Sequence, residues 1–442
     1  MPASKSFAKI FFPIFYLGLY LLNIPLSAQQ DPESPYGRII KEIRIEGLKH
    51  TKKYIVTREL LSKAGEPLLK ENLAKEYKNL NLLDIFSSIN SQLSIEADGV
   101  ILIYSFAETP SFIPSPGISI TEENGFSGGG SLISTNLLGR DIFMSARVLF
   151  GEAKTGELWL ENPWITGNHL GYKLEYYYRD RTSFLGDFHE KANEFYLRIG
   201  SHLGENGRFG GIFEALNIQS DIAGVTLSAD NIDTTSRIGF YLGYDNRDAI
   251  SDTRRGWWNE IVISRDIHLF KDSSNFWQTD IDIRRYYPLP YWERHSLALF
   301  SLLTLRTGTL GEEVAPWQLF GIGGTNTVRG WKYAARSGKN QFLNTIEYRI
   351  TLLKPRPIAL PLNIHYRLGL QLCLFGDMGI GWNKGNQFAA HNFIGGFGFG
   401  VRLLVPIVGA VRIDFGWGQK GEGIFIHLGS FEKPVMTRRR VR

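Results

Sequence analysis

Residues 411–417 read Val-Arg-Ile-Asp-Phe-Gly-Trp, and their pattern sets the architecture expected for most of this chain. Large apolar side chains occupy every second position, while Arg412, Asp414 and Gly416 stand between them. A period of two is typical of a β-strand. Charged residues of both signs on one face, with apolar and aromatic residues on the other, indicate a strand between a polar lumen and lipid. The stretch therefore predicts one strand of a transmembrane antiparallel β-barrel.

The same alternation recurs in both directions from this stretch, in residues 172–179 and 280–284 for example, and from Pro110 onward no helical period is visible. With about 20 residues for each strand and its connection, residues 110–431 would form about 16 strands. The sheet must close, because lipid offers nothing to an unpaired strand edge. The alternative is a soluble all-β protein, whose strands would not carry charges on one face so regularly.

The first residues have the parts of an export signal. Lys5 and Lys9 precede an apolar run from Ile10 to Leu22, and Leu26-Ser27-Ala28 offers a small-residue cleavage site. We therefore predict a signal peptide over residues 1–28; the alternative is an uncleaved membrane anchor. No later apolar run approaches the roughly 20 residues of a spanning helix.

Residues 39–109 have a different pattern, which predicts a small domain of order β-α-α-β-β. Thr51 is expected to cap the first helix, and Asp98-Gly99 is a hairpin turn signal. The apolar positions that define the helices are Val56, Leu60 and Ala64 in the first, and Leu73, Tyr77 and Leu80 in the second.

Composition argues against several classes of function. The chain has 442 residues, a net charge of +5, 9 histidines and a single cysteine, Cys373. Four of its arginines lie within residues 438–442, so the rest is nearly balanced, and we expect no nucleic-acid partner. No catalytic or cofactor-binding motif is present, and Asp280 and Asp282 beside Arg284 fit a charge ladder in a wet pore better than a carboxylate pair. We expect no enzyme, no cofactor and no metal site.

Residues 323–331, Gly-Gly-Thr-Asn-Thr-Val-Arg-Gly-Trp, are the most specific stretch. They resemble the lumen-loop signature of the BamA/TamA-like outer-membrane assembly superfamily, also called the bacterial surface antigen family, with Trp331 where Phe or Tyr is usual. The resemblance implies that Val328, Arg329, Gly330 and Trp331 enter the lumen and that Arg329 pairs with acids on the wall. The positions that match are Glu347 in residues 341–349 and Asp377 in Phe375-Gly376-Asp377-Met378-Gly379. The alternative is that Arg329 is a solvated loop residue.

Further stretches extend this resemblance: residues 136–140, 244–248 and 398–402 are similar to family turns and strands, and residues 39–109 resemble a POTRA domain. Residues 424–431 resemble the last-strand signal, with Phe431 as its terminal aromatic residue, although a basic tail follows over residues 432–442. Glycine weakens strand pairing, so a seam between first and last strands is a candidate site. Its predicted residues are Gly128, Gly129, Gly130, Gly429 and Phe431; ordinary bulges are the alternative explanation for the glycines.

The resemblance implies an outer-membrane protein assembly or insertion factor, with its POTRA domain in the periplasm and its barrel in the bacterial outer membrane. Its partners would be unfolded outer-membrane β-barrel proteins and the lipid bilayer; accessory lipoproteins and periplasmic chaperones are further candidates. The alternatives are a two-partner secretion pore, which usually carries two POTRA domains and a plug helix that residues 29–37 are too short to supply, and a passive porin-like channel.

Overall fold

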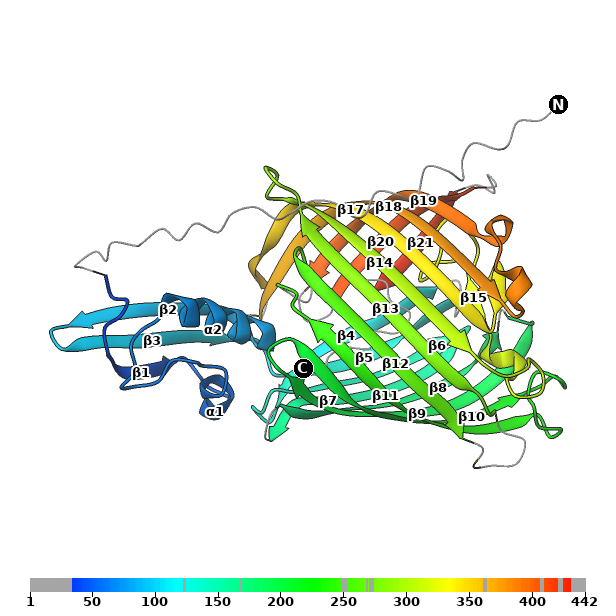
Figure 1. Ribbon diagram of the computed structural model, residues 1–442, viewed down its shortest axis with the longest axis horizontal. Helices are drawn as coiled ribbons and strands as arrows, with labels where there is room; N and C mark the ends of the chain where they lie inside the picture. Colours follow the sequence, from blue (N-terminus) through cyan, green and yellow to red (C-terminus); the bar gives the residue numbers. More distant parts are fainter. Residues whose placement is uncertain are drawn as a thin grey trace.

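The computed structural model describes residues 34–121, 125–166, 169–183, 185–248, 253–267, 269, 274–360, 364–405, 409–419 and 424–430. These residues form a sheet of 16 antiparallel strands curled into a barrel, with a small unit attached at one end (Figure 1). The predicted fold class is confirmed. The predicted signal peptide, Phe431 and the basic tail lie outside the described residues.

The barrel strands follow one another around the sheet in chain order, from β4 to β21. One long connection interrupts the series, between β14 and β17, and contains the short hairpin β15–β16. The strands are β4 (Ile113–Thr121), β5 (Gly125–Leu137), β6 (Ile142–Gly151), β7 (Lys154–Thr166), β8 (Leu170–Ser183), β9 (Phe188–Leu203), β10 (Gly207–Ser220), β11 (Ile232–Asp245), β12 (Gly256–Ile267), β13 (Trp277–Pro288), β14 (His295–Arg306), β17 (Asn340–Leu360), β18 (Ile364–Trp382), β19 (Ile394–Val405), β20 (Gly409–Gly418) and β21 (Ile424–Ser430).

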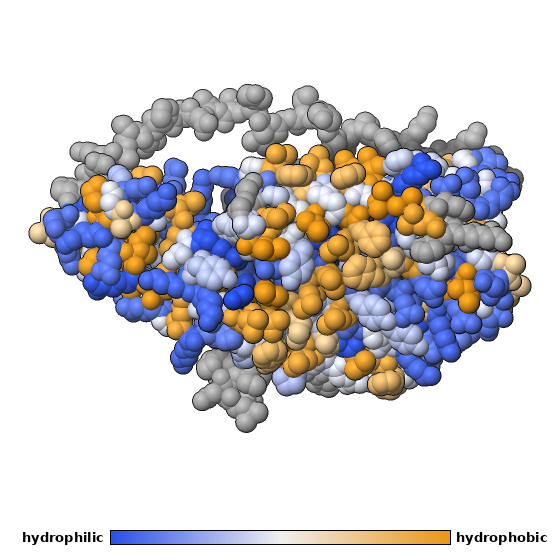
Figure 2. Space-filling model, turned by 90° about the horizontal axis from the view of Figure 1, so that it is seen from below, coloured by the Kyte–Doolittle hydropathy of each residue, from blue (hydrophilic) through white to orange (hydrophobic). Residues whose placement is uncertain are grey.

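The two faces of each strand meet different environments, the lumen and the outside of the barrel, as the alternation of residues predicts. On β13, Asp282 and Arg284 are buried in the lumen, where Arg284 Nε lies 2.9 Å from Asp282 Oδ1, while Ile283 between them is 43% exposed on the outside. Apolar residues cover a broad area of the outer wall, and hydrophilic residues gather at the end of the barrel opposite the small unit (Figure 2). We call the end that carries the small unit the proximal end and the opposite one the distal end.

The small N-terminal unit has the predicted order β-α-α-β-β. Its elements are β1 (Ile40–Glu46), α1 (Lys53–Thr57), α2 (Lys70–Leu83), β2 (Phe86–Glu96) and β3 (Gly99–Glu108), and its sheet order is β1-β3-β2 with β1 and β3 parallel. The helices cover one face of this sheet around Leu80, Val100 and Leu102, which are fully buried. Within the described residues, no helix is long and apolar enough to cross a membrane.

Three details of the predicted helices are wrong. Helix α1 ends at Thr57 and does not reach Leu60 or Ala64, and no side chain caps it. The next residues turn away because the buried carboxylate of Glu76 accepts hydrogen bonds from the backbone nitrogens of Leu61 and Ser62, at 2.8 and 2.5 Å. On α2, Glu76 therefore occupies the buried face, and Tyr77 is 50% exposed.

A specific joint holds the N-terminal unit against the barrel turn between β5 and β6. Thr51 Oγ1 accepts from Asn136 Nδ2 at 2.8 Å, Lys52 N donates to Gly139 O at 2.9 Å, and Arg58 Nη2 lies 2.8 Å from Asp141 Oδ2. Gly139 has a φ of +71°, and a Cβ there would lie 2.1 Å from the carbonyl oxygen of His50. The turn thus admits only glycine where the two parts meet.

Candidate functional site

The connection between β14 and β17 carries the predicted lumen motif into the barrel. It contains a 3-10 turn (Pro316–Gln318), β15 (Phe320–Ile322) and β16 (Arg336–Gly338), and the motif lies at the tip of this hairpin. Gly323 and Gly324 have φ values of +118° and +90°, which allow the chain to reverse there. The hydroxyl of Thr327 locks the reversal, since it donates to Gly323 O and accepts from Gly323 N, both at 2.7 Å.

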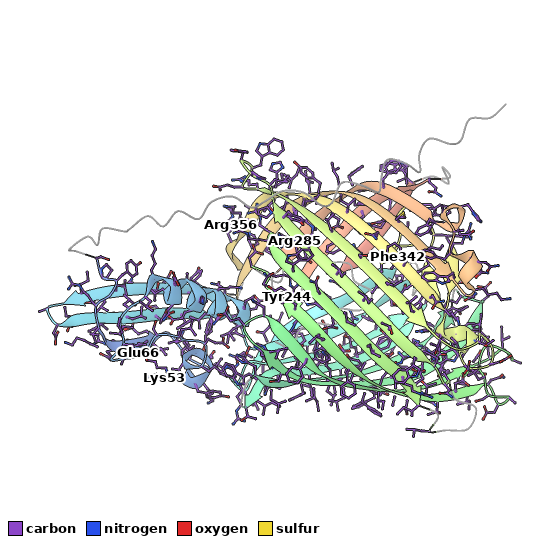
Figure 3. All side chains as sticks on the ribbon, in the orientation of Figure 1. Lys53, Glu66, Tyr244, Arg285, Phe342 and Arg356 are labelled. Carbon is purple, nitrogen blue, oxygen red and sulfur yellow. The ribbon has the colours of Figure 1, made fainter. Side chains whose placement is uncertain are left out.

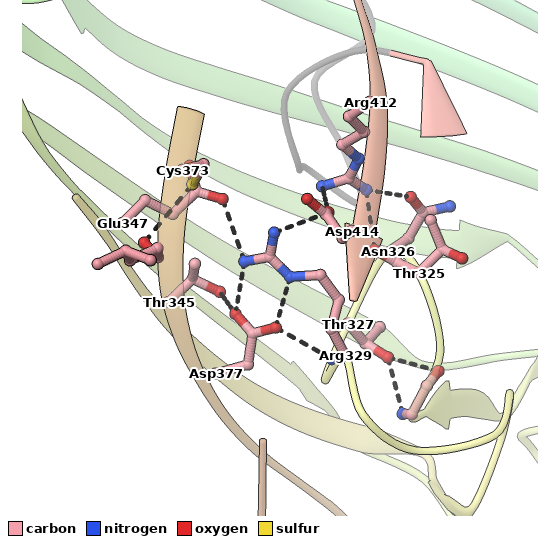
Figure 4. Close-up of polar contacts among 12 residues, drawn as sticks. Thr325, Asn326, Thr327, Arg329, Thr345, Glu347, Cys373, Asp377, Arg412 and Asp414 are labelled. Atoms are coloured by element: carbon pink, nitrogen blue, oxygen red, sulfur yellow. Dashed lines mark hydrogen bonds and ion pairs between the residues drawn. The ribbon is translucent and has the colours of Figure 1, made fainter. Parts of the chain in front are cut away.

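Arg329 at this tip is fully buried and faces three carboxylates (Figure 4). Its Nε lies 2.8 Å from Asp377 Oδ2 and its Nη2 lies 3.1 Å from Asp377 Oδ1, which is the two-point geometry of a guanidinium on a carboxylate. Nη2 also lies 3.1 Å from Glu347 Oε1, and Nη1 lies 2.9 Å from Asp414 Oδ2. The structure thus brings Arg329, Glu347 and Asp377 together.

Strand register places these acids opposite the loop tip. Glu347 lies on β17 and Asp377 on β18, and Thr345, which is directly opposite Asp377 in the ladder, donates its hydroxyl to Asp377 Oδ1 at 2.8 Å. The backbone nitrogen of Arg329 donates to the other oxygen, Asp377 Oδ2, at 3.0 Å. Asp377 is therefore saturated by donors from both the wall and the loop.

Sequence reasoning missed part of this cluster. Arg402 on β19 donates to Glu347 Oε1 at 2.6 Å, and Arg412 on β20 holds the loop tip by donating to Thr325 O at 2.8 Å. The complete cluster contains the guanidinium groups of Arg329, Arg349, Arg402 and Arg412 and the carboxylates of Glu347, Asp377 and Asp414. A sequence signal for these residues exists: Arg402, Arg412 and Asp414 occupy the polar positions of strands in which polar and apolar residues alternate, and these positions face the lumen.

Apolar contacts and direct contacts between backbones complete the packing of the loop against the wall. The guanidinium carbon of Arg329 lies 3.5 Å from the ring centre of Phe375, and Trp331 Nε1 donates to Gly395 O at 2.8 Å. Val328 and Trp331 are buried in a cluster with wall residues of β14, β17 and β19. A Cβ on Gly396 would lie 1.8 Å from Arg329 O, and one on Gly330, whose φ is +87°, would lie 2.4 Å from Trp417 C. The loop backbone therefore touches the wall backbone directly.

A second anchor holds the same connection at the distal end. Trp317 Nε1 donates to the buried Asp233 Oδ2 at 2.8 Å, and its ring packs against Ala192, Leu216 and Ile218. These partners belong to β9–β11, whereas Arg329 binds β17, β18 and β20. The connection thus spans the lumen between two walls.

The residues predicted for the seam lie at separate places. Gly128, Gly129 and Gly130 belong to β5, the second barrel strand, where each pairs with a residue of β4 and of β6. Gly429 lies on the last strand, β21, opposite Arg412, and Phe431 lies outside the described residues. The ends of the sheet are β4 and β21; they lie in contact, but no ladder joins them among the residues described here.

The cluster has the chemistry of an anchor. Each carboxylate faces at least one guanidinium, a pairing that offsets the hydration that these charges lose in a confined space. In the described part of the chain, no group of three or more His, Cys, Asp or Glu side chains could hold a metal ion.

Comparison with known proteins agrees with this geometry. A family model described as the Omp85 superfamily domain matches residues 136–430, which is more than half of the chain. A structure of BamA from Haemophilus ducreyi lacking POTRA domains 1–3 is similar at a TM-score of 0.56 and 15% identity, over 88% of this chain and 83% of that one. A search of the curated proteins found no match.

Two structures of CdiB are similar as well. The one from Acinetobacter baumannii has a TM-score of 0.54 and 16% identity, over 90% of this chain and 72% of that one. The one from Escherichia coli has a TM-score of 0.54 and 12% identity, over 92% of this chain and 90% of that one. At these identities the likeness concerns the fold.

Proposed function

Because the chain belongs to the Omp85 superfamily, we propose that it assembles or inserts other β-rich proteins in the bacterial outer membrane. The barrel spans the membrane, the N-terminal unit lies in the periplasm, and the substrates are unfolded outer-membrane β-barrel proteins. The role is not enzymatic. The observation that carries this proposal is the seam between β4 and β21.

The seam supports a templating step. Within the described residues its strands have 9 and 7 residues, against 21 for β17, and no ladder joins them, so their separation would break little strand pairing. An open seam would expose backbone donors and acceptors at the level of the lipid, where only another strand can satisfy them. A client strand that pairs there enters the membrane without a bare edge. The free energy comes from the folding of the client, and no nucleotide is required.

The N-terminal unit supports a capture step. β2 pairs only with β3 among the described residues, so its outer edge offers main-chain groups to an extended client segment. The joint at Gly139 holds this unit at the proximal end of β5 and β6, next to β4. A strand captured on β2 is thus held close to one side of the seam.

The lumen loop supports the integrity of the wall beside the seam. Arg329 of the loop binds acids on β17, β18 and β20, and Arg412 of β20 donates a hydrogen bond to the loop tip. Strand β20 is the neighbour of β21, the mobile partner in our proposal. The anchor would keep the rest of the barrel closed while β21 separates from β4.

A dedicated secretion pore of the two-partner type is the second candidate, because the fold is shared with both CdiB structures. A passive channel is less favoured, since the connection between β14 and β17 spans the lumen. Depletion of the protein in its own host, followed by quantification of the outer-membrane and periplasmic proteomes, separates the three. Loss of many β-barrel proteins supports the assembly role, and retention of one exported protein in the periplasm with an unchanged outer membrane supports the pore. An unchanged proteome, together with a large steady conductance of the purified protein, supports the passive channel.

Reconstitution tests the templating step directly. The full chain in liposomes should accelerate the folding of a urea-denatured β-barrel client, measured by its heat-modifiable migration. A cysteine pair that locks β4 to β21 should abolish the acceleration under oxidising conditions and restore it on reduction. Equal acceleration by the locked protein would contradict the seam proposal.

A further inference from the structure

Arg285 stands on the lipid-facing side of the barrel. On β13 the lumen-facing residues are Asp280, Asp282, Arg284 and Tyr286, so Arg285 and Tyr287 point outward, as does Trp257 opposite Arg285 on β12. Figure 3 shows Arg285 near the proximal end of the outer wall, in the same region as Tyr244. A charged side chain on the lipid face costs about 2–4 kcal/mol at the midplane and little near the interface. Its position calls for an anionic partner at that level.

The chain itself supplies no such partner among the residues that the structure describes. The guanidinium carbon lies 4.6 Å from the ring centre of Trp257 and 4.3 Å from that of Tyr287. Arg285 forms no ion pair with any residue that the structure describes. Its Nε is buried without a hydrogen bond. This nitrogen is shielded, and the rings hold the guanidinium in place, so its two terminal nitrogens are the donors left for an external acceptor.

A groove lies beside it on the same wall. It has a volume of about 550 Å³, and its lining includes the exposed apolar residues Leu203, Leu242 and Ile261, together with Tyr244 and Asn259. Two carboxylates also belong to the lining, and each is already paired with a cation of the protein: Glu205 with Lys75 and Glu260 with Arg198. Asn259 is two residues from Trp257 on the same face of β12, and its side-chain oxygen is buried without a hydrogen bond in the described structure. The groove thus combines an apolar floor with polar groups at the edge nearest Arg285.

We propose that this surface binds a glycerophospholipid of the proximal leaflet, with its phosphate on Arg285 and an acyl chain in the groove. The phosphate supplies the negative charge and the acceptor oxygens that the guanidinium lacks, and a planar guanidinium matches them with two parallel hydrogen bonds. The groove accepts the chain because its floor already faces hydrocarbon.

Arg265 is a matched control. It lies on the outer face of β12 toward the distal end, and its guanidinium carbon is 5.2 Å from the ring centre of Trp277. Unlike Arg285, it donates to a side chain of the protein, Asn275 Oδ1, at 3.2 Å. Both arginines stack on tryptophan, but only Arg285 is left for an external anion.

The test compares lipids that differ only in the phosphate headgroup. Delipidated full-length protein in dodecyl maltoside is titrated with dioleoylphosphatidylglycerol or dioleoylglycerol, and bound lipid is counted by native mass spectrometry. The wild type should prefer the phospholipid, R285Q should bind it at least about tenfold more weakly, as expected for one charge-assisted hydrogen-bonded contact, and R265Q should match the wild type.

Three results would overturn the proposal: no preference of the wild type between the two lipids, equal binding by R285Q and wild type, or an equal loss in R265Q. Inorganic phosphate at 10-fold excess distinguishes the source of the anion. If it displaces the lipid, Arg285 is a site for free phosphate and the lipid assignment fails; if it does not, the lipid assignment stands. Should R285Q not fold, the wild-type comparison of the two lipids still decides.

Discussion

Arg329 and Asp377 form a two-point ion pair, 2.8 and 3.1 Å long, between the tip of a loop and the inner wall of the barrel, although 48 residues separate them in the chain. Both side chains are fully buried. The pair is therefore the main electrostatic contact that fixes where the connection between β14 and β17 ends inside the lumen.

Replacement of Arg329 by Ala should destabilise the barrel by about 3–5 kcal/mol, because three carboxylates would then share a buried site with less positive charge. The measurement is the temperature at which the purified protein loses its compact, heat-modifiable migration. Arg336→Ala is the control, since Arg336 lies exposed in the same hairpin and donates to the backbone oxygen of its neighbour Ala335. Equal transition temperatures for R329A and wild type would contradict an anchoring role.

The Gly330→Ala substitution should prevent the loop from seating. Its φ of +87° disfavours any side chain, and a Cβ would also lie 2.4 Å from Trp417 C. We expect a loss of about 2–4 kcal/mol from strain and overpacking together. Gly311→Ala separates the two effects, because Gly311 has a φ of +88° and a methyl group added there would meet nothing within 4 Å. G311A should lose only about 1–2 kcal/mol; an equal loss in both variants would mean that the close contact has no influence.

The Gly139→Ala substitution should release the N-terminal unit from the barrel, because its methyl group would overlap the carbonyl oxygen of His50. Limited proteolysis should then cut the short link between β3 and β4 faster, while the heat-modifiability of the barrel stays unchanged. Gly204→Ala is the control: its φ is +66°, with open space around it, in another turn of the barrel. If G139A and G204A were cut at the same rate, the joint at Gly139 would not restrain the unit.

The loop before α1 should loosen in acid. Glu108 Oε1 accepts from Thr51 N at 2.7 Å and its Oε2 accepts from His50 N at 2.9 Å. Burial acts to raise the pKa of the Glu108 carboxyl, but the hydrogen bonds from Thr51, His50 and Lys49 outweigh it, so the pKa is lowered. A lowered folded-state pKa means that the stabilisation is fully present above the unfolded pKa of about 4.3 and is lost as the pH falls through the folded value.

Amide hydrogen exchange of residues 47–53, corrected for the intrinsic rate, tests this expectation. Protection should be constant between about pH 7 and pH 5 and should fall in stronger acid. Glu108→Gln should show reduced protection already at neutral pH and a weaker dependence on pH. Glu46→Gln, at an exposed position of β1, serves as the control. Protection in E108Q that followed the wild-type pH profile would rule Glu108 out as the group responsible.

Local patterns were enough to predict the barrel, its strand number and the order of the N-terminal elements. A period-two alternation with charges on one face is a property of each strand alone. It indicates that the charged face meets the water of the lumen and that the apolar face meets lipid. The positions of Arg329, Glu347 and Asp377 as lumen-loop and wall residues could also be predicted, because the family resemblance rests on contiguous motifs.

Contacts between distant segments could not be predicted in this way. The C-terminal end of α1 depends on Glu76. The backbone nitrogens of Leu61 and Ser62 donate to its carboxylate instead of to helix carbonyl oxygens, and no local propensity encodes that competition. Likewise, Asp414 and Arg412 join the cluster only because β20 lies beside β19 and its lumen face contacts the loop tip. Strand periodicity specifies which face a side chain occupies, whereas the depth of the loop and the register of neighbouring strands specify which side chain it meets.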